Sequence, residues 1–412
     1  TSPRRCDTPR PMAARKTRRR SRGVTGRIHP VSPYELFYDL VFAGAILGLS
    51  IDFGRSDKWS AFWVAATTFT FAWWIWQETV LFTNRFGDPL GPVPASANRR
   101  EAMTILLIRW VCLLQMVAVV LVALFEPAYL DPDELRGEFA WACAGALAAL
   151  ALLREIGARQ MPKLEASVAK RRPWEIIAIA FFVADALTDK STGPWLWLAA
   201  LSFTVLPGLY LEVQERRSDT RAEKAHLSER LMLFVLIISG DIFLKIIVYW
   251  NTNQAFSVDP LQLIFVSSSI FSVFRLYISR VESVKPPSNS GQFVGWLLLH
   301  LVLSFSLLVA AGGMVQYVTP KETLTYFHLM SAGWGIALTV ACIAALHRIG
   351  AGPGAGRAAL NLLGIALLVG VGATAATYAT PQDWRVGMAT IAVILLVYTT
   401  NTSILQIRAR PR

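Results

Sequence analysis

Ten ionisable side chains lie within, or at the start of, long apolar segments of this 412-residue sequence. An ionisable group in the hydrocarbon core of a bilayer costs at least about 2.5–3.5 kcal/mol on insertion scales, so such groups normally face the protein interior and often mark function. They form either an ion pathway or a buried charge network. The candidates are Glu35, Asp39, Glu78, Arg109, Glu229, Arg230, Asp241, Lys245, Arg275 and His300.

Two pairs of these residues have helical spacing. Glu35 and Asp39 are four residues apart, as are Asp241 and Lys245, so each pair would share a helix face and the second could form a direct ion pair. One interpretation is a cation or proton pathway lined by Asp39 and Asp241. The other is a structural network in which acids and bases neutralise one another and fix the helix register. His300 is open to the same two interpretations, as a proton relay or as a hydrogen-bonded packing residue.

Motifs of several enzyme classes are missing from the sequence. It contains no GxxxxGK[ST] phosphate loop, no HExxH metal pair and no GxSxG nucleophile elbow. Paired Asp-rich clusters, which would hold magnesium against a diphosphate, are also absent. The four cysteines are scattered without CxxC spacing and read as packing residues. We therefore predict no enzymatic activity, no cofactor and no metal site.

The composition indicates a membrane protein, because 54% hydrophobic residues and 14 Trp are too apolar for a soluble chain. A net charge of +12 would suggest nucleic acid as the partner of a soluble protein. Here the basic residues lie mostly outside the apolar runs, where they can face anionic lipid. The predicted partner is the bilayer, and nucleic acid is not expected.

The apolar segments predict a polytopic bundle of about twelve transmembrane helices, since a spanning helix needs roughly 20 apolar residues. The predicted spans are 34–53, 59–82, 103–125, 138–154, 174–187, 193–213, 229–250, 260–280, 291–313, 324–347, 358–379 and 385–407. The fifth is short, but removing it would invert every later loop and spoil the charge pattern described next.

Basic residues are unevenly distributed between alternating loops. Together with the two ends of the chain, one set carries thirty Lys and Arg residues and the opposite set carries six. Because Lys and Arg are retained on the cytoplasmic side, this asymmetry predicts that both termini are cytoplasmic. The predicted location is the cell (plasma) membrane.

Three regions are predicted along the chain. Residues 1–30, rich in Arg and poor in apolar residues, are expected to form a disordered cytoplasmic tail that binds anionic headgroups. Residues 31–215 would form the first transmembrane half (helices 1–6) and 216–412 the second (helices 7–12). The segment around Asp39 aligns with that around Asp241 at an offset of about 200 residues. Two parallel six-helix repeats would explain this alignment; chance similarity between apolar helices is the alternative.

Three segments, taken together, carry a family resemblance. They are ELFYDLVF at residues 35–42, NRF at 84–86, and HxxERxxLF at 226–234, which is followed by Gly240 and Asp241. They resemble the bacterial low temperature requirement A (LtrA) family, whose members carry ELFFDLVFV near the start and HxxERFGLF…LGE past the middle. Tyr38 stands in place of the usual Phe, and Asp241 in place of the usual Glu. The resemblance extends from about residue 30 to the last helix.

The resemblance implies a bacterial inner-membrane protein of a family named for a growth phenotype in the cold, with no settled activity. We favour a channel or transporter for a cation or small solute. The alternative is a non-transporting structural or regulatory membrane protein involved in cold or stress adaptation. A water-filled cavity reaching Asp39 and Asp241 would support transport, whereas acids paired directly with buried bases would support the alternative. The sequence leaves the oligomeric state open, a homo-oligomer included.

Overall fold

The computed structural model describes the chain over twelve stretches and forms only helices and short connections in them. These stretches are residues 32–55, 58–86, 98–130, 136–160, 162–188, 193–215, 224–252, 260–282, 286–318, 326–351, 355–379 and 384–408. The predicted all-α fold is confirmed for these residues. The predicted basic tail and its anionic lipid contacts lie outside them.

Twelve α helices follow one another in the described residues, as many as the apolar segments predict. The first six are α1 (Pro33–Arg55), α2 (Trp59–Phe86), α3 (Arg99–Leu130), α4 (Arg136–Gln160), α5 (Pro162–Leu187) and α6 (Gly193–Glu215). The second six are α7 (Lys224–Thr252), α8 (Pro260–Tyr277), α9 (Ser290–Val318), α10 (Tyr326–Ala351), α11 (Gly356–Ala379) and α12 (Trp384–Arg408). A π-helical turn, η1 (Ile278–Glu282), continues α8.

Within the described part of the chain, nine of these helices are long and apolar enough to cross a membrane. The chain is therefore a multi-span membrane protein. The other three are α2, α5 and α7, whose sequences include several charged or polar residues. In α2 and α7 many of these polar side chains are buried against other helices, where they do not need to be soluble in lipid.

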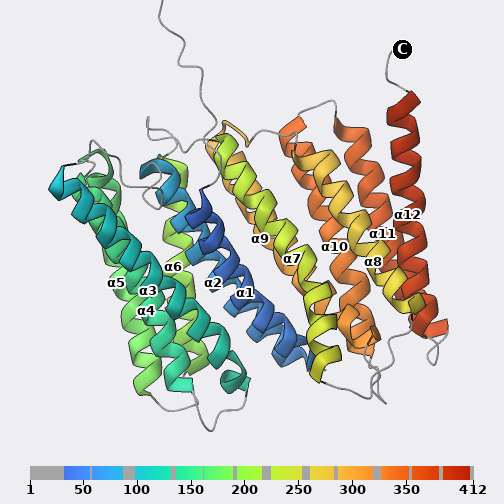
Figure 1. Ribbon diagram of the computed structural model, residues 1–412, viewed down its shortest axis with the longest axis horizontal. Coiled ribbons are helices and arrows are strands. Elements are labelled where there is room, and N and C mark those ends of the chain that lie inside the picture. The colour runs from blue at the N-terminus through green and yellow to red at the C-terminus, as the bar shows by residue number, and fades with distance from the viewer. Residues whose placement is uncertain are drawn as a thin grey trace, which may run out of the picture. The chain divides into compact units, whose positions relative to one another are not determined.

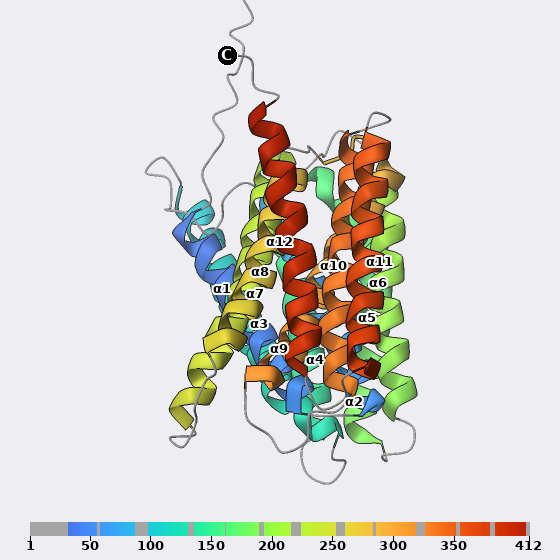
Figure 2. The same ribbon diagram turned by 90° about the vertical axis from the view of Figure 1, so that its right-hand side faces the viewer.

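Four helices occupy the middle of the bundle. Figure 1 shows α1, α2, α7 and α9 there, with α3–α6 on one flank and α8 with α10–α12 on the other. Figure 2, turned by 90°, places α8, α10, α11 and α12 together on the flank that faces the viewer. The largest fully buried side chains include Trp73 and Trp76 of α2, so the centre of the bundle is packed with aromatic rings.

The fifth helix differs from its predicted span. The apolar pattern predicts residues 174–187, but α5 begins at Pro162 and passes through Pro173. Its first half carries Lys170, Arg171 and Arg172, and a hydropathy criterion excludes these charges although the backbone remains helical. Pro173 has no N–H to donate to the preceding turn, and the helix continues in spite of it.

The predicted repeat stays a prediction. At the same offset of about 200 residues, Phe71 of α2 aligns with Phe271 of α8, which would make these helices counterparts, but the two helices have different surroundings. Phe71 of α2 is 0% exposed, whereas the aligned Phe271 of α8 is 62% exposed. In the second half it is α9 that packs extensively against α1 and α7, whereas α8 contacts α7 only slightly. The boundary between the halves falls between α6 and α7, outside the described residues.

Glycines allow α9 and α10 to approach backbone to backbone. A Cβ atom on Gly313 would lie 2.6 Å from the Ala332 backbone nitrogen, and one on Gly335 would lie 2.7 Å from that of Ala310. Small residues at helix contacts are the usual way to gain van der Waals packing in a bilayer. Cys112, Cys143 and Cys342 are also buried and free, in agreement with their interpretation as packing residues.

We expect Gly335→Ala to destabilise the protein by about 1–3 kcal/mol, because the added methyl group would meet backbone atoms of α9 that cannot rotate away. Gly295→Ala on α9 is the matched control. Its Cβ would meet nothing within 4 Å, so the higher helix propensity of Ala should make it neutral or stabilising by about 0.5–1 kcal/mol. Thermal unfolding in detergent compares the two variants. Equal melting temperatures would contradict the close approach of α9 and α10.

Candidate functional site

The start of α1 positions the first acidic residues. The Ser32 hydroxyl accepts a hydrogen bond from the Glu35 backbone N–H at 3.2 Å, and Glu35 Oε2 accepts one from the Ser32 N–H at 3.0 Å. Pro33 lies between them at the first helical position, where its fixed φ suits the helix. This capping box begins α1 at a defined residue. One turn further along, Asp39 then points into the bundle.

Asp39 and Arg230 form an ion pair between α1 and α7, and both residues are 0% exposed. Arg230 Nε donates to Asp39 Oδ2 at 3.1 Å, and its Nη2 donates to Oδ1. Trp76 Nε1 donates to Oδ1 at 2.8 Å, and Arg230 Nη1 donates to the Thr83 hydroxyl at 3.1 Å. The bidentate geometry with additional donors is the arrangement that best offsets the desolvation of a buried pair.

Glu35 joins the same group of charges from one turn earlier. Its Oε1 lies 3.5 Å from Arg230 Nη1 and 3.1 Å from His226 Nε2. The hydrogen bond to Glu35 and the charge of that carboxylate raise the pKa of His226, which lies near the start of α7. Arg230 therefore contacts two carboxylates, and His226 contacts the more peripheral one.

Three hydrogen-bonded contacts between α1 and α7 share one sequence offset. Glu35 contacts His226, Asp39 contacts Arg230, and Ser50 contacts Asp241, each 191 residues later in the chain. A constant offset means that the two helices run parallel and in register across about four turns. We call this line of contacts the α1–α7 seam.

A second buried ion pair lies further along the α1–α7 seam, inside α7 itself. Lys245 Nζ is 2.7 Å from Asp241 Oδ2, as the four-residue spacing predicts, and both residues are buried. The Ser50 hydroxyl of α1 donates to the same Oδ2 at 3.0 Å. Asp241 Oδ1 is buried and accepts no hydrogen bond from the described residues.

A third group of charges gathers around Glu78 of α2. Arg154 of α4 donates to Glu78 Oε2 at 2.5 Å and also pairs with Glu175 of α5. Arg171 of α5 lies 3.2 Å from the same Oε2 and 3.8 Å from Glu212 of α6. All five side chains are buried. We call these residues, contributed by four helices, the Glu78 cluster.

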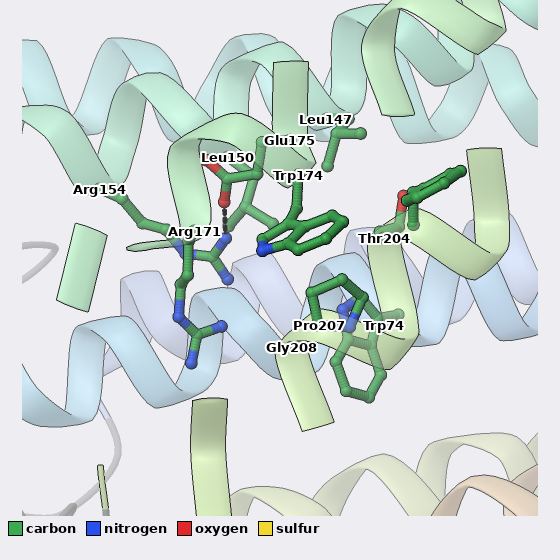
Figure 3. A pocket seen from close by; sticks show the side chains of 11 residues that line it. Trp74, Leu147, Leu150, Arg154, Arg171, Trp174, Glu175, Thr204, Pro207 and Gly208 are labelled. Carbon is green, nitrogen blue, oxygen red and sulfur yellow. Dashed lines mark hydrogen bonds and ion pairs between the residues drawn. The ribbon is translucent and has the colours of Figure 1, made fainter. Parts of the chain in front are cut away.

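A small cavity of about 20 Å³ adjoins the Glu78 cluster, with Trp74, Trp174, Pro207 and Gly208 among its lining residues. Figure 3 shows Arg154 and Glu175 joined beside it and the Trp174 ring along its wall. This volume accommodates about one water molecule. A side chain at Gly208 would meet the Trp74 ring at 2.6 Å, so glycine is needed where α6 passes α2.

Apart from Ser50, the residues of the α1–α7 seam are also residues of the sequence motifs. Glu35 and Asp39 belong to ELFYDLVF, and His226 and Arg230 belong to HxxERxxLF. The model of one family, described as bacterial low temperature requirement A protein (LtrA), matches residues 30–398. This chain belongs to the LtrA family. No curated protein and no solved structure was found to match it.

Tyr38, which stands in place of the Phe usual in the LtrA pattern, has a hydrogen-bond partner in the structure. The Tyr38 hydroxyl donates to Gln115 Oε1 of α3 at 2.7 Å, a bond that the usual Phe could not form. The Thr79 hydroxyl of α2 donates to the same oxygen at 3.1 Å. Tyr38 and Gln115 are both buried, so the substitution adds a polar link between α1, α2 and α3 in this LtrA protein.

The remaining predicted acidic and basic residues are less buried than these groups. Arg109 is half-buried on α3, with its guanidinium 5.5 Å from the centre of the Tyr34 ring. Glu229 is half-buried near the start of α7. Arg275 was expected in the interior but is exposed on α8, where its long side chain can extend toward a polar surface.

His300 is buried in α9, and both of its ring nitrogens have hydrogen-bond partners. Nδ1 is 2.8 Å from the Trp296 carbonyl oxygen, and Nε2 is 3.2 Å from the Tyr277 hydroxyl. A carbonyl can only accept, so Nδ1 donates; in a neutral ring Nε2 then accepts from the Tyr277 hydroxyl. These contacts fit the packing interpretation better than the proton relay.

Sequence reasoning missed most of the Glu78 cluster. It counted Arg154 and Arg171 among the loop charges and did not consider Glu175 and Glu212. One signal was available, because Arg171 and Glu175 are four residues apart and would share a face of a helix that began earlier. It also missed the ion pair between Arg136 at the start of α4 and buried Asp185 near the end of α5.

Proposed function

We propose that this LtrA protein transports a cation or small solute, with the Asp241 carboxylate as the group that binds a cation or a proton. Asp241 pairs directly with buried Lys245, which by the criterion stated above favours a structural role; the observation that carries the transport proposal is that this buried pair lies within the single helix α7. A pair inside one helix fixes little between helices, and among the described residues the Ser50 hydroxyl is its contact on α1. Intramembrane charges with so little structural benefit are typical of ion and proton pathways.

The free oxygen of Asp241 supports the same role. Oδ2 contacts Lys245 and Ser50, whereas Oδ1 accepts no hydrogen bond from the described residues. A buried acceptor without a partner costs about 1–3 kcal/mol, and a proton or a cation at Oδ1 would remove that cost. Binding there would also weaken the attraction between Asp241 and Lys245. Occupancy of the site is thus coupled to the state of the ion pair.

A non-transporting structural or regulatory protein is the second candidate, and the Asp39–Arg230 pair favours it. That pair joins two helices, is completely buried and has donors on both carboxylate oxygens. Glu78 is likewise paired directly with Arg154 and Arg171. In this second candidate the charged residues only hold the helices together, and Asp241 binds no proton or cation. Any role in adaptation to cold or stress would then depend on other surfaces of the protein.

Ion flux into liposomes separates the two candidates. Purified protein in liposomes should carry protons, sodium or potassium faster than protein-free liposomes, and Asp241→Asn should reduce this flux at least tenfold. Glu155→Gln is the control, because Glu155 is partly exposed and pairs with exposed Arg172 outside all three buried groups. If the parent protein carried none of the three cations, the second candidate would replace the first. If Asp241→Asn carried them at the parent rate, transport would not depend on the Asp241 carboxylate and the proposed role of Asp241 would be wrong.

We also propose that all twelve helices span the plasma membrane, with both termini in the cytoplasm. The thirty-to-six distribution of basic residues between alternating loops supports this orientation. A cysteine placed at Ser218 in a background without native cysteines should resist an impermeant reagent added outside intact cells. Rapid labelling from outside would overturn the orientation.

A further inference from the structure

A cavity separate from the buried ion pairs lies between α5 and α6. It has a volume of about 440 Å³, within the roughly 300–1,000 Å³ of ordinary small-molecule sites. Lys170 and Trp174 line it from α5, and Leu206, Tyr210 and Gln214 line it from α6. Trp174 is 40% exposed and Leu206 and Tyr210 are each 63% exposed, so the cavity is open to the surroundings of the bundle.

The lining residues are ordered by polarity along the helices. On α6, Leu206, Tyr210 and Gln214 are four residues apart and form one stripe, and on α5 the same spacing separates Lys170 from Trp174. Because α5 and α6 are consecutive packed helices of opposite direction, Lys170 in the first half of α5 and Gln214 near the end of α6 lie toward the same end of the cavity. The Trp174 ring stacks on Phe203 of α6, with ring centres 6.0 Å apart, so it lies further along the cavity, near Leu206. The order along the cavity is therefore cation and amide first, then aromatic and apolar side chains.

This order matches the chemistry of one molecule. A phospholipid presents a charged phosphate, then the ester region where Trp and Tyr side chains concentrate, then apolar chains. The exposed Lys170 complements a negative headgroup, as basic residues near a membrane surface do. We propose that the groove between α5 and α6 binds one anionic phospholipid, with its phosphate at Lys170 and an acyl chain along Leu206. This inference is independent of whether the protein transports a solute.

The lipid would touch the outer wall of the Glu78 cluster. Trp174 and Pro207 line both this groove and the small cavity beside Arg154 and Glu175, and Figure 3 shows both residues at that cavity. Arg171 follows Lys170 in the sequence but points into the cluster, where it contacts Glu78. Of these two neighbouring basic residues of α5, Lys170 thus faces the groove and Arg171 faces the buried acids.

Native mass spectrometry of the full chain in detergent tests the proposal with phosphatidylglycerol and phosphatidylcholine of identical acyl chains. The protein should retain phosphatidylglycerol more strongly. Lys170→Gln should weaken phosphatidylglycerol binding about fivefold, the contribution of one basic residue near an anionic surface. It should weaken phosphatidylcholine binding less, because the choline ammonium of that lipid offsets the charge of its phosphate. Arg357→Gln is the matched control, since Arg357 is an exposed cation at the start of α11 and does not line the groove.

A second variant tests the apolar part of the groove. Leu206→Trp should fill the inner end and reduce the binding of both lipids, with the melting temperature of the protein as the check on folding. Equal losses of phosphatidylglycerol in Lys170→Gln and Arg357→Gln would mean that overall charge, not this groove, attracts the lipid. Unchanged binding in Leu206→Trp would place the lipid elsewhere. Either result overturns the proposal.

Discussion

Arg230→Leu is expected to lower the free energy of unfolding by about 3–5 kcal/mol, the usual effect of removing one partner from a buried ion pair. Arg230 is 0% exposed, and its guanidinium is the donor that Asp39, Glu35 and the Thr83 hydroxyl share. Without it, two carboxylates remain in the interior with less compensation. Thermal and denaturant unfolding of purified protein in detergent would measure the loss.

Two further variants make the Arg230 prediction specific. Adding Asp39→Asn to Arg230→Leu should restore part of the lost stability, because the stranded charge is removed. Arg172→Leu is the control: Arg172 pairs with Glu155 on the exposed face of the helices, where an ion pair contributes only about 0–1 kcal/mol. If Arg230→Leu cost no more than Arg172→Leu, Asp39 and Arg230 would not form the buried pair described above.

Asp241→Asn is expected to be nearly as destabilising, about 3–5 kcal/mol, because it leaves Lys245 charged and buried. Adding Lys245→Met should restore most of the loss, since Met has a similar shape and no charge to desolvate. Under the proposed function, the double variant is folded but does not transport. Unfolding measurements on the double variant should therefore show that stability is recovered, whereas liposome measurements should show that cation flux is still absent.

The double variant can also contradict the proposed role of Asp241 in cation binding. If Asp241→Asn with Lys245→Met carried cations at the parent rate, Asp241 would not be the binding carboxylate. If instead Asp241→Asn alone were as stable as the parent, the carboxylate would not neutralise Lys245 in the folded protein. Ser50→Ala is a useful comparison, because it removes the hydroxyl that contacts Asp241 and keeps both charges.

Local sequence patterns predicted the features that depend on neighbouring residues. Helical spacing was enough to predict the Asp241–Lys245 pair, and hydropathy together with the charge pattern of the loops was enough to predict the twelve helices. Asp39 and Arg230 are both in the predicted set, but their pairing joins residues 191 positions apart and depends on which helices are neighbours. Hydropathy carries no information about that choice, because any apolar helix packs acceptably against another.

The wrong predictions for α5 and for several charged residues follow from how hydropathy treats charge. A hydropathy window treats a charge as the end of a span, so it shortened α5 and assigned Arg154 and Arg171 to loops. The structure places both side chains inside the bundle, where Glu78, Glu175 and Glu212 compensate them. Conversely, the expectation that an intramembrane charge faces inward does not hold for Arg275, because a long side chain on an outer helix can reach a polar surface.

The shared offset along the α1–α7 seam limits how these two helices can move. A slide by one turn, about 5.4 Å, would set Phe234 opposite Asp39 and separate the carboxylate from Arg230. Phe234 is itself stacked on Trp76, with ring centres 4.1 Å apart, so the same slide would also break an aromatic contact with α2. Sliding along the α1–α7 seam is thus opposed by the Asp39–Arg230 ion pair and by the Phe234–Trp76 ring contact. We therefore expect a conformational change to carry α1 and α7 together, with the movement taken up at their borders with the flanking helices.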